Sequence, residues 1–127
     1  MSAATGPRRN LVFARVGRTS LHAHWLAEPA ADRNWDLQLS TWIEDLAGLT
    51  EGDVPVHVDA GVKWGCVGRF FTERPELLDR YDYVHFPDDD LLFDVGSISR
   101  IFTICREHGL QIAQPALRLS SYASYPL

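Results

Sequence analysis

Short apolar runs alternate with segments of helical periodicity along most of this chain. Leu11–Val16 is an apolar run that ends at Gly17, as expected of a strand buried on both faces. A helix is expected over residues 21–26, and residues 35–41 alternate with period two, which indicates a half-buried strand. Strands that alternate with helices need crossover connections, so the pattern predicts a largely parallel sheet.

The second half of the chain continues this alternation. Two helical pieces are expected between residues 63 and 81, joined near Glu73, because Pro75 suits the first turn of a helix. Another helical pattern runs from Ile98 to Cys105 and stops at Gly109. Three further segments are expected as strands, at 54–58, 83–86 and 110–114.

Length and composition limit the fold to one domain. The chain has 127 residues, of which 46% are hydrophobic and 23% are charged, close to the average of globular proteins. Residues 1–9 are small, polar and basic, and we expect a flexible N-terminal arm there. Residues 10–127 are expected to form a single α/β domain, Rossmann-like, with a largely parallel sheet flanked by helices.

The charge balance and the apolar runs narrow the classes of partner. Seventeen acidic residues against twelve lysines and arginines give a net charge of -5, so no nucleic-acid partner is expected. No apolar run approaches the length of a membrane span, and the N-terminus has no apolar signal core. Cys66 and Cys105 lie in apolar settings and are expected to be small buried side chains, which fits a cytoplasmic protein.

Three adjacent carboxylates, Asp88, Asp89 and Asp90, stand where the strand at 83–86 ends. Each close pair repels by about 1 kcal/mol even in water, so a cation is an effective way to hold them together. In an extended or turn conformation the first and third side chains point to the same side, which lets Asp88 and Asp90 approach one hard divalent ion. The alternative is an acidic turn or a helix cap.

The sequence around these aspartates carries a family resemblance. The stretch Tyr81-Asp-Tyr-Val-His-Phe-Pro-Asp-Asp-Asp-Leu-Leu92 resembles the aspartate motif of GT-A-type glycosyltransferases. The similarity continues in Gly61-Val-Lys-Trp64 before the motif and in 109–117 and 120–126 after it. This combination looks like an uncharacterised bacterial and plant family grouped with that clan. The resemblance implies a domain that binds a nucleotide diphosphate sugar with a metal and takes part in glycosyl transfer.

The resemblance also implies roles for particular residues. Asp88 and Asp90 would bind Mn²⁺ or Mg²⁺, and Asp89 would lie near the donor sugar or ribose. Arg18 follows the first strand, where such a fold receives the nucleotide, so it is a candidate base or phosphate contact or else a solvated loop arginine. Lys63 is a candidate phosphate partner or else a surface lysine.

A complete domain of this class also contains an acceptor half. The resemblance therefore implies that this chain corresponds to the nucleotide-sugar-binding half only and is inactive alone. A parallel sheet needs cover on both faces, so apolar surface left exposed is expected to produce a homodimer. Tyr122 and Tyr125 are expected to be core residues, with stacking on a base or sugar as the alternative.

Two other functions stay open. One is a metal-dependent hydrolase with a mixed site for zinc, manganese or iron, built from His22, His24, His57, Asp59 and His85 together with Asp88. His22 and His24 would point to different faces of a helix, which weakens that site. The other is a non-catalytic module that binds nucleotide sugars or a protein partner.

Overall fold

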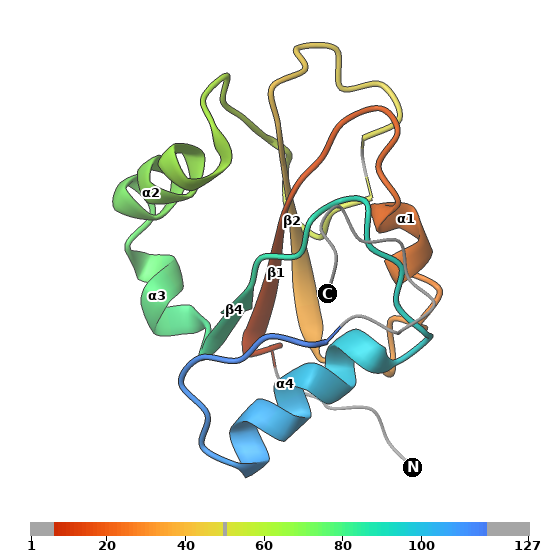
Figure 1. Cartoon of the computed structure of the whole chain (residues 1–127). Coiled ribbons are helices and arrows are strands. Elements are labelled where there is room, and N and C mark those ends of the chain that lie inside the picture. Colours follow the sequence, from red (N-terminus) through yellow and green to blue (C-terminus); the bar gives the residue numbers. More distant parts are fainter. Residues whose placement is uncertain (1–6, 50, 117–127) are drawn as a thin grey trace.

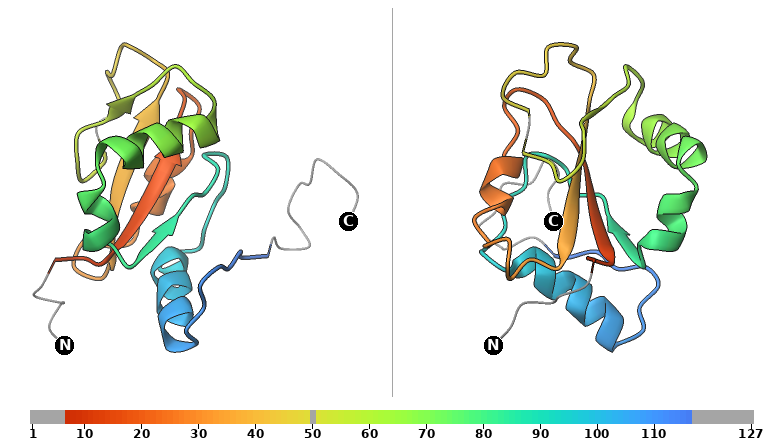
Figure 2. Two further views of the ribbon diagram at one scale, coloured as in Figure 1. Left: turned by 90° about the vertical axis from the view of Figure 1, so that its left-hand side faces the viewer. Right: turned by 180° about the vertical axis from the view of Figure 1, so that it is seen from behind.

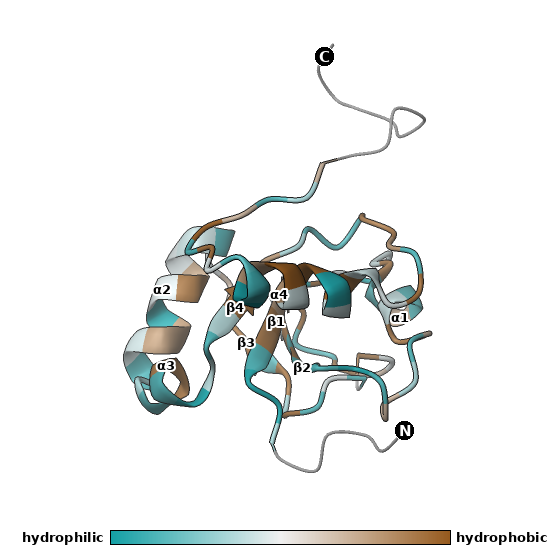
Figure 3. Ribbon diagram, turned by 90° about the horizontal axis from the view of Figure 1, so that it is seen from below, coloured by the Kyte–Doolittle hydropathy of each residue, from teal (hydrophilic) through white to brown (hydrophobic). Residues whose placement is uncertain are grey.

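The structure, a computed structural model, describes residues 7–49 and 51–116. In these residues, four parallel strands form one sheet in the order β3-β2-β1-β4: β1 (Asn10–Arg15), β2 (Trp35–Thr41), β3 (His57–Val58) and β4 (Tyr83–His85). Helices α2 (Lys63–Glu73) and α3 (Glu76–Arg80) lie on one side of the sheet, and α1 (His22–Trp25) and α4 (Ser97–Glu107) lie on the other (Figures 1 and 3). The predicted α/β fold, with a parallel sheet flanked by helices, is confirmed.

The central strand β1 is buried on both faces, as its unbroken apolar run predicts. Val12 and Ala14 belong to the core on the side of α1 and α4, where they share a cluster with Phe102. Phe13 points to the opposite side, and its ring centroid lies 4.9 Å from that of Phe70 in α2. Both cores therefore depend on β1.

Strand β2 is buried along its whole length, whereas its alternating pattern predicts a half-buried strand. Its polar residues lie under α2 and α3 instead of facing solvent. Asp36 accepts a hydrogen bond from the Tyr81 hydroxyl at 2.6 Å, and the Gln38 amide donates to the Pro55 carbonyl oxygen at 3.0 Å. Burial of polar groups is tolerated only with such partners, so a hydrogen-bonded layer covers β2 beside the apolar core at Phe13.

The predicted ends of the later helices are confirmed. Helix α2 ends at Glu73 and α3 begins after Pro75. Helix α4 stops before Gly109, which adopts a φ of 61° that few other residues tolerate. The amide of Leu110 then donates to the Cys105 carbonyl oxygen at 2.9 Å, which closes the last turn.

The strand predicted at 110–114 is wrong. Residues 110–116 form no strand, and Figure 2 (left) shows this segment running away from the sheet. Leu110 is 37% exposed and Ile112 is 95% exposed, so their alternation buries little apolar surface. Two apolar side chains do not offset the entropy lost by ordering a strand.

Residues 1–6 of the expected arm lie outside the described residues, as do Tyr122 and Tyr125. Arg8 forms an ion pair with Asp36 at 3.2 Å, and Arg9 forms one with Asp82 at 2.8 Å.

Cys66 and Cys105 are free and buried, as expected. Within the described ranges, no helix has both the length and the apolar character to cross a membrane.

The packing of Phe13 yields a stability prediction. Phe13→Ala should lower the free energy of unfolding by about 3–5 kcal/mol, because it opens a cavity in the core between β1 and α2. Ile112→Ala should change it by less than about 0.5 kcal/mol, because that side chain is almost fully exposed. Urea denaturation followed by circular dichroism measures both. A large loss with Ile112→Ala would mean that residues 110–114 pack as a strand after all.

Candidate functional site

The loops after β1 and β4 meet at a topological switch point. From β1 the chain crosses one side of the sheet through α1 to reach β2, and from β3 it crosses the other side through α2 and α3 to reach β4. Strands β2 and β4 therefore lie on opposite sides of β1. In parallel α/β sheets, ligands bind where the crossovers diverge in this way, beyond the carboxyl ends of the strands.

Asp89 joins these two loops. Its Oδ2 accepts a hydrogen bond from the backbone amide of Gly17 at 3.0 Å, and its carbonyl oxygen accepts one from the amide of Leu21 at 2.7 Å. The side chain expected near a donor sugar or ribose is therefore engaged by the protein backbone. Its first role in this structure is to fix the loop after β1 against residues 88–90, which we call the acidic loop.

Asp88 and Asp90 are exposed on either side of this anchored residue. The side chain of Asp88 is 70% exposed, and its Oδ1 lies 2.9 Å from the Lys63 Nζ. Lys63 also donates to the Phe86 carbonyl oxygen at 3.3 Å. The structure thus brings together Lys63 and the acidic loop, two elements that the resemblance had linked.

Arg18 is held elsewhere. Its guanidinium donates to the carbonyl oxygens of Asp45 and Ala47 in the loop after β2, and it lies 3.6 Å from the Asp45 carboxylate. The side chain is 45% exposed. Arg18 consequently joins the loop after β1 to the loop after β2, and no contact in the described residues joins it to Asp88, Asp89 or Asp90.

Arg15, which the sequence reasoning missed, braces the loop after β3. Its Nη2 donates to the carbonyl oxygens of Asp59 and Gly61, and its Nη1 donates to Ser40 Oγ at 3.1 Å. Nothing in the sequence pattern signals this, because an arginine at the end of an apolar run is equally compatible with solvent. The contact orders the chain just before α2, and with it Lys63.

An ion pair between Arg69 and Asp59 also fixes the loop after β3. Two nitrogens of Arg69 each lie 2.7 Å from an oxygen of Asp59. These bonds, together with the Gly61 amide, hold the pKa of Asp59 well below its usual range. A Cβ at Gly61 would lie 2.0 Å from the Arg69 guanidinium, so a larger residue there would force the arginine side chain to shift.

The histidines do not form one site. His22 contacts Ser20 Oγ at 2.7 Å and Glu51 Oε2 at 3.1 Å, whereas His24 is exposed. The His57 Nδ1 lies 3.0 Å from Ser40 Oγ.

His85 packs between aromatic rings, with centroids 6.0 Å from Phe93 and 6.1 Å from Phe102. In residues 7–49 and 51–116, no group of three or more histidine, cysteine, aspartate or glutamate side chains is arranged to hold a metal. Within this part of the chain, neither the histidines of the hydrolase alternative nor Asp88, Asp89 and Asp90 are assembled into such a group.

The donor set at the acidic loop fits one class of metal. Magnesium and manganese are commonly held by one or two carboxylates, with water and substrate phosphates completing the shell. Asp88 and Asp90 offer two exposed carboxylates of this kind, whereas structural zinc requires four ligands. A divalent ion at this loop would thus depend on a phosphate ligand for the rest of its coordination.

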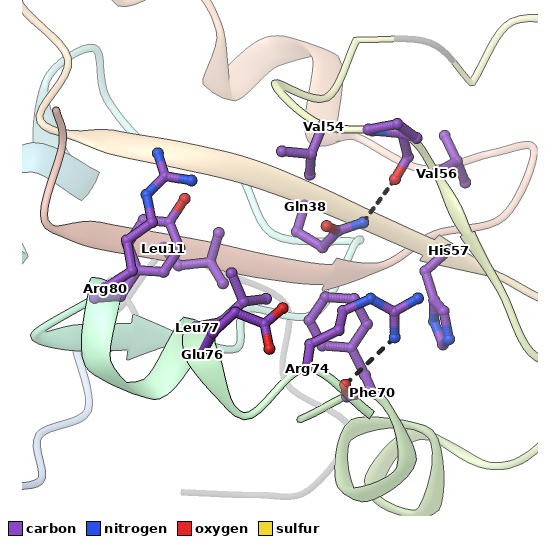
Figure 4. A pocket seen from close by; sticks show the side chains of 12 residues that line it. Leu11, Gln38, Val54, Val56, His57, Phe70, Arg74, Glu76, Leu77 and Arg80 are labelled. Carbon is purple, nitrogen blue, oxygen red and sulfur yellow. Dashed lines mark hydrogen bonds between the residues drawn. The ribbon is translucent and has the colours of Figure 1, made fainter. Parts of the chain in front are cut away.

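A separate hollow of about 360 Å³ lies between the sheet and the α2–α3 layer (Figure 4). Arg74 lies along it and donates to the Phe70 carbonyl oxygen at 3.3 Å. Burial and the neighbouring Arg74 lower the pKa of His57 at one end. Asp88, Asp89 and Asp90 are not among its lining residues, so the hollow is distinct from the loop region at the strand ends.

Two exposed tryptophans flank the acidic loop and were not assigned to a site from the sequence. Trp42 follows β2 and is 52% exposed, and Trp64 stands in the first turn of α2 and is 64% exposed. Other exposed apolar side chains are spread along the chain: Val58, Val62, Leu78, Leu92, Val95, Ile104, Leu110 and Ile112.

The environment of His85 gives a prediction for acid stability. Burial and the nearby Lys63 lower its pKa to about 4 from the ordinary value of 6.5. Between these values the unfolded chain binds a proton that the folded chain excludes, so stability falls as pH drops from 6.5 to 4. His85 should contribute on the order of 2–3 kcal/mol to that loss.

Comparing His85→Phe with the original chain in urea titrations at several pH values isolates this contribution. The variant should lose less stability over that interval, and His24→Ala should behave like the original chain because His24 is exposed. Identical pH dependence in His85→Phe and the original chain would contradict a buried neutral imidazole.

Comparison with known proteins gives one match. A family model described as "Protein of unknown function (DUF707)" covers residues 34–126, a span that includes Lys63 and the acidic loop. Searches of curated proteins and of solved structures found no match. Since the family model covers well over half of the chain, this protein belongs to the DUF707 family.

Proposed function

We propose that this chain is a glycosyltransferase-like protein that binds a nucleotide diphosphate sugar, with Mn²⁺ or Mg²⁺ held by Asp88 and Asp90. The observation that carries the proposal is the switch point itself. The loops after β1 and β4 are fastened there by the bond from Gly17 to Asp89, and two exposed carboxylates stand beside that bond.

The charges at this place suit a diphosphate. Two carboxylates alone would repel an anionic ligand, so binding requires cations. Lys63 supplies one from the protein, 2.9 Å from Asp88. A divalent ion supplies the rest, and when bound it would stabilise negative charge that develops on a departing diphosphate.

The residues of the chain itself position the ligand. Asp89 keeps the acidic loop against Gly17, and Arg15 orders the loop that leads into α2. Lys63 can exchange its contact with Asp88 for a phosphate oxygen without a change in the backbone, because its side chain is flexible and 25% exposed. The site is thus largely preformed.

The non-catalytic alternative uses the same site. A module that only binds nucleotide sugars would need the carboxylates and Lys63 but no acceptor site. Donor turnover by this chain across several nucleotide sugars would exclude the non-catalytic module, whereas its absence fits both functions because the chain is expected to be inactive alone. The homodimer expected from the sequence stays a prediction, and light scattering measures it.

The proposal predicts metal-dependent nucleotide binding. Isothermal titration with UDP or GDP should give a signal with MnCl₂ that disappears with chelator. Asp88→Asn and Asp90→Asn should each weaken binding at least about tenfold, because each removes a charged ligand. Asp79→Asn, the same charge change in α3, is the matched control and should bind like the original chain. Equal binding by all four proteins would remove the metal role of the acidic loop.

Lys63 provides an independent prediction. Lys63→Met should weaken UDP binding several-fold in the presence of Mn²⁺, because a phosphate partner is lost. It should leave the affinity for Mn²⁺ alone unchanged or tighter, because Asp88 loses its competing cation. Titration of the metal and of the nucleotide in separate experiments measures both. Weaker binding of Mn²⁺ alone would contradict the assignment of Lys63 to the diphosphate.

A further inference from the structure

The indole of Trp42 is exposed and yet held in place. It is 52% exposed, which is unusual for a large apolar ring. A Cβ added at Gly17 would lie 3.1 Å from two atoms of its six-membered ring, so the ring lies directly against the Gly17 backbone. On this ring the Arg15 guanidinium carbon lies 5.5 Å from the centroid. Backbone contact and a cation therefore restrict the ring while much of it remains accessible.

Trp42 lies close to the acidic loop, because both contact Gly17. The Gly17 amide that binds Asp89 belongs to the residue against which the indole packs. Strand β1 separates β2, which leads into Trp42, from β4, which leads into the acidic loop. The indole and the Asp89 carboxylate therefore both lie against Gly17. A flat group on the indole would thus lie beside a diphosphate at the aspartates, within reach of the same nucleotide.

We infer that Trp42 is the stacking platform for the nucleobase of the bound nucleoside diphosphate. This inference rests on the proposed function, because it needs the diphosphate to lie at the acidic loop. Stacking on an aromatic ring is worth roughly 5- to 100-fold in affinity per base and is available to every base. Trp42 thus gives affinity for nucleotides over inorganic diphosphate without choosing among bases.

Trp64 does not meet the same conditions. It follows Lys63 directly, and the Lys63 Nζ that binds Asp88 lies 5.0 Å from its ring centroid. A base stacked on Trp64 would compete with the Lys63 ammonium group, which the proposed function assigns to the diphosphate. Its ring also packs edge-on against Phe86 at 5.5 Å. Trp64 is therefore the matched control, an exposed tryptophan with a cation nearby.

The experiment compares UDP, ADP and inorganic pyrophosphate by isothermal titration with MnCl₂. The proteins are the full chain and its Trp42→Leu, Trp42→Phe and Trp64→Leu variants, with folding checked by circular dichroism. The full chain should bind both nucleotides at least about fivefold more tightly than pyrophosphate. Trp42→Leu should lose this preference and keep pyrophosphate binding. Trp42→Phe should retain most of it because the π-face remains, and Trp64→Leu should behave like the full chain.

The other outcomes are distinguishable. Equal affinity of the full chain for UDP and pyrophosphate, or a preference that survives Trp42→Leu, would overturn the inference and leave the diphosphate site standing. Loss of the preference in Trp64→Leu would move the platform to α2 and also overturn it. If none of the three probes shows metal-dependent binding, the proposed function and the inference are both overturned.

Discussion

The hydrogen bond from the Gly17 amide to the carboxylate of Asp89 is the contact on which the candidate site depends. It joins residues 72 positions apart in the sequence and fastens the loop after β1 to the loop after β4. A hydrogen bond to a charged group contributes about 1.5–3 kcal/mol. The same bond engages the carboxylate of Asp89, whereas Asp88 and Asp90 are exposed. Asp89 thus holds the fold, and our proposal assigns Asp88 and Asp90 to the ligand.

A second constraint is the polar layer beneath α2 and α3. Asp36, Gln38 and Ser40 lie on one side of β2, and each has a partner from another part of the chain. Hydrogen bonds of this kind require particular geometry, whereas apolar contacts tolerate sliding. They therefore fix the register of β2 and of the loop before α2. Through that loop they set the position of Lys63 near the acidic loop.

Local patterns predicted most of the elements, and long-range contacts account for what was missed. The apolar run of β1 and the break at Pro75 are local signals, and both are confirmed. The indole of Trp42 packs against Gly17, 25 positions away, a contact that no periodicity reveals. The alternation at residues 110–114 predicted a strand that the structure lacks, because a strand also needs a pairing edge. Lys63 and Asp88 were linked through a resemblance, and their contact is now seen at 2.9 Å.

Manganese-induced broadening of amide resonances is the most direct test that the strand-end loops form a divalent-metal site. In a nitrogen–proton correlation spectrum, substoichiometric Mn²⁺ with UDP should first broaden the amides of Gly17, Lys63 and residues 88–90. The amides of Arg80, Asp82 and Arg106, which lie where β4 begins, at the opposite end of the strand, should remain sharp. Broadening centred on those residues, or spread evenly over the acidic surface, would contradict a metal site at the switch point.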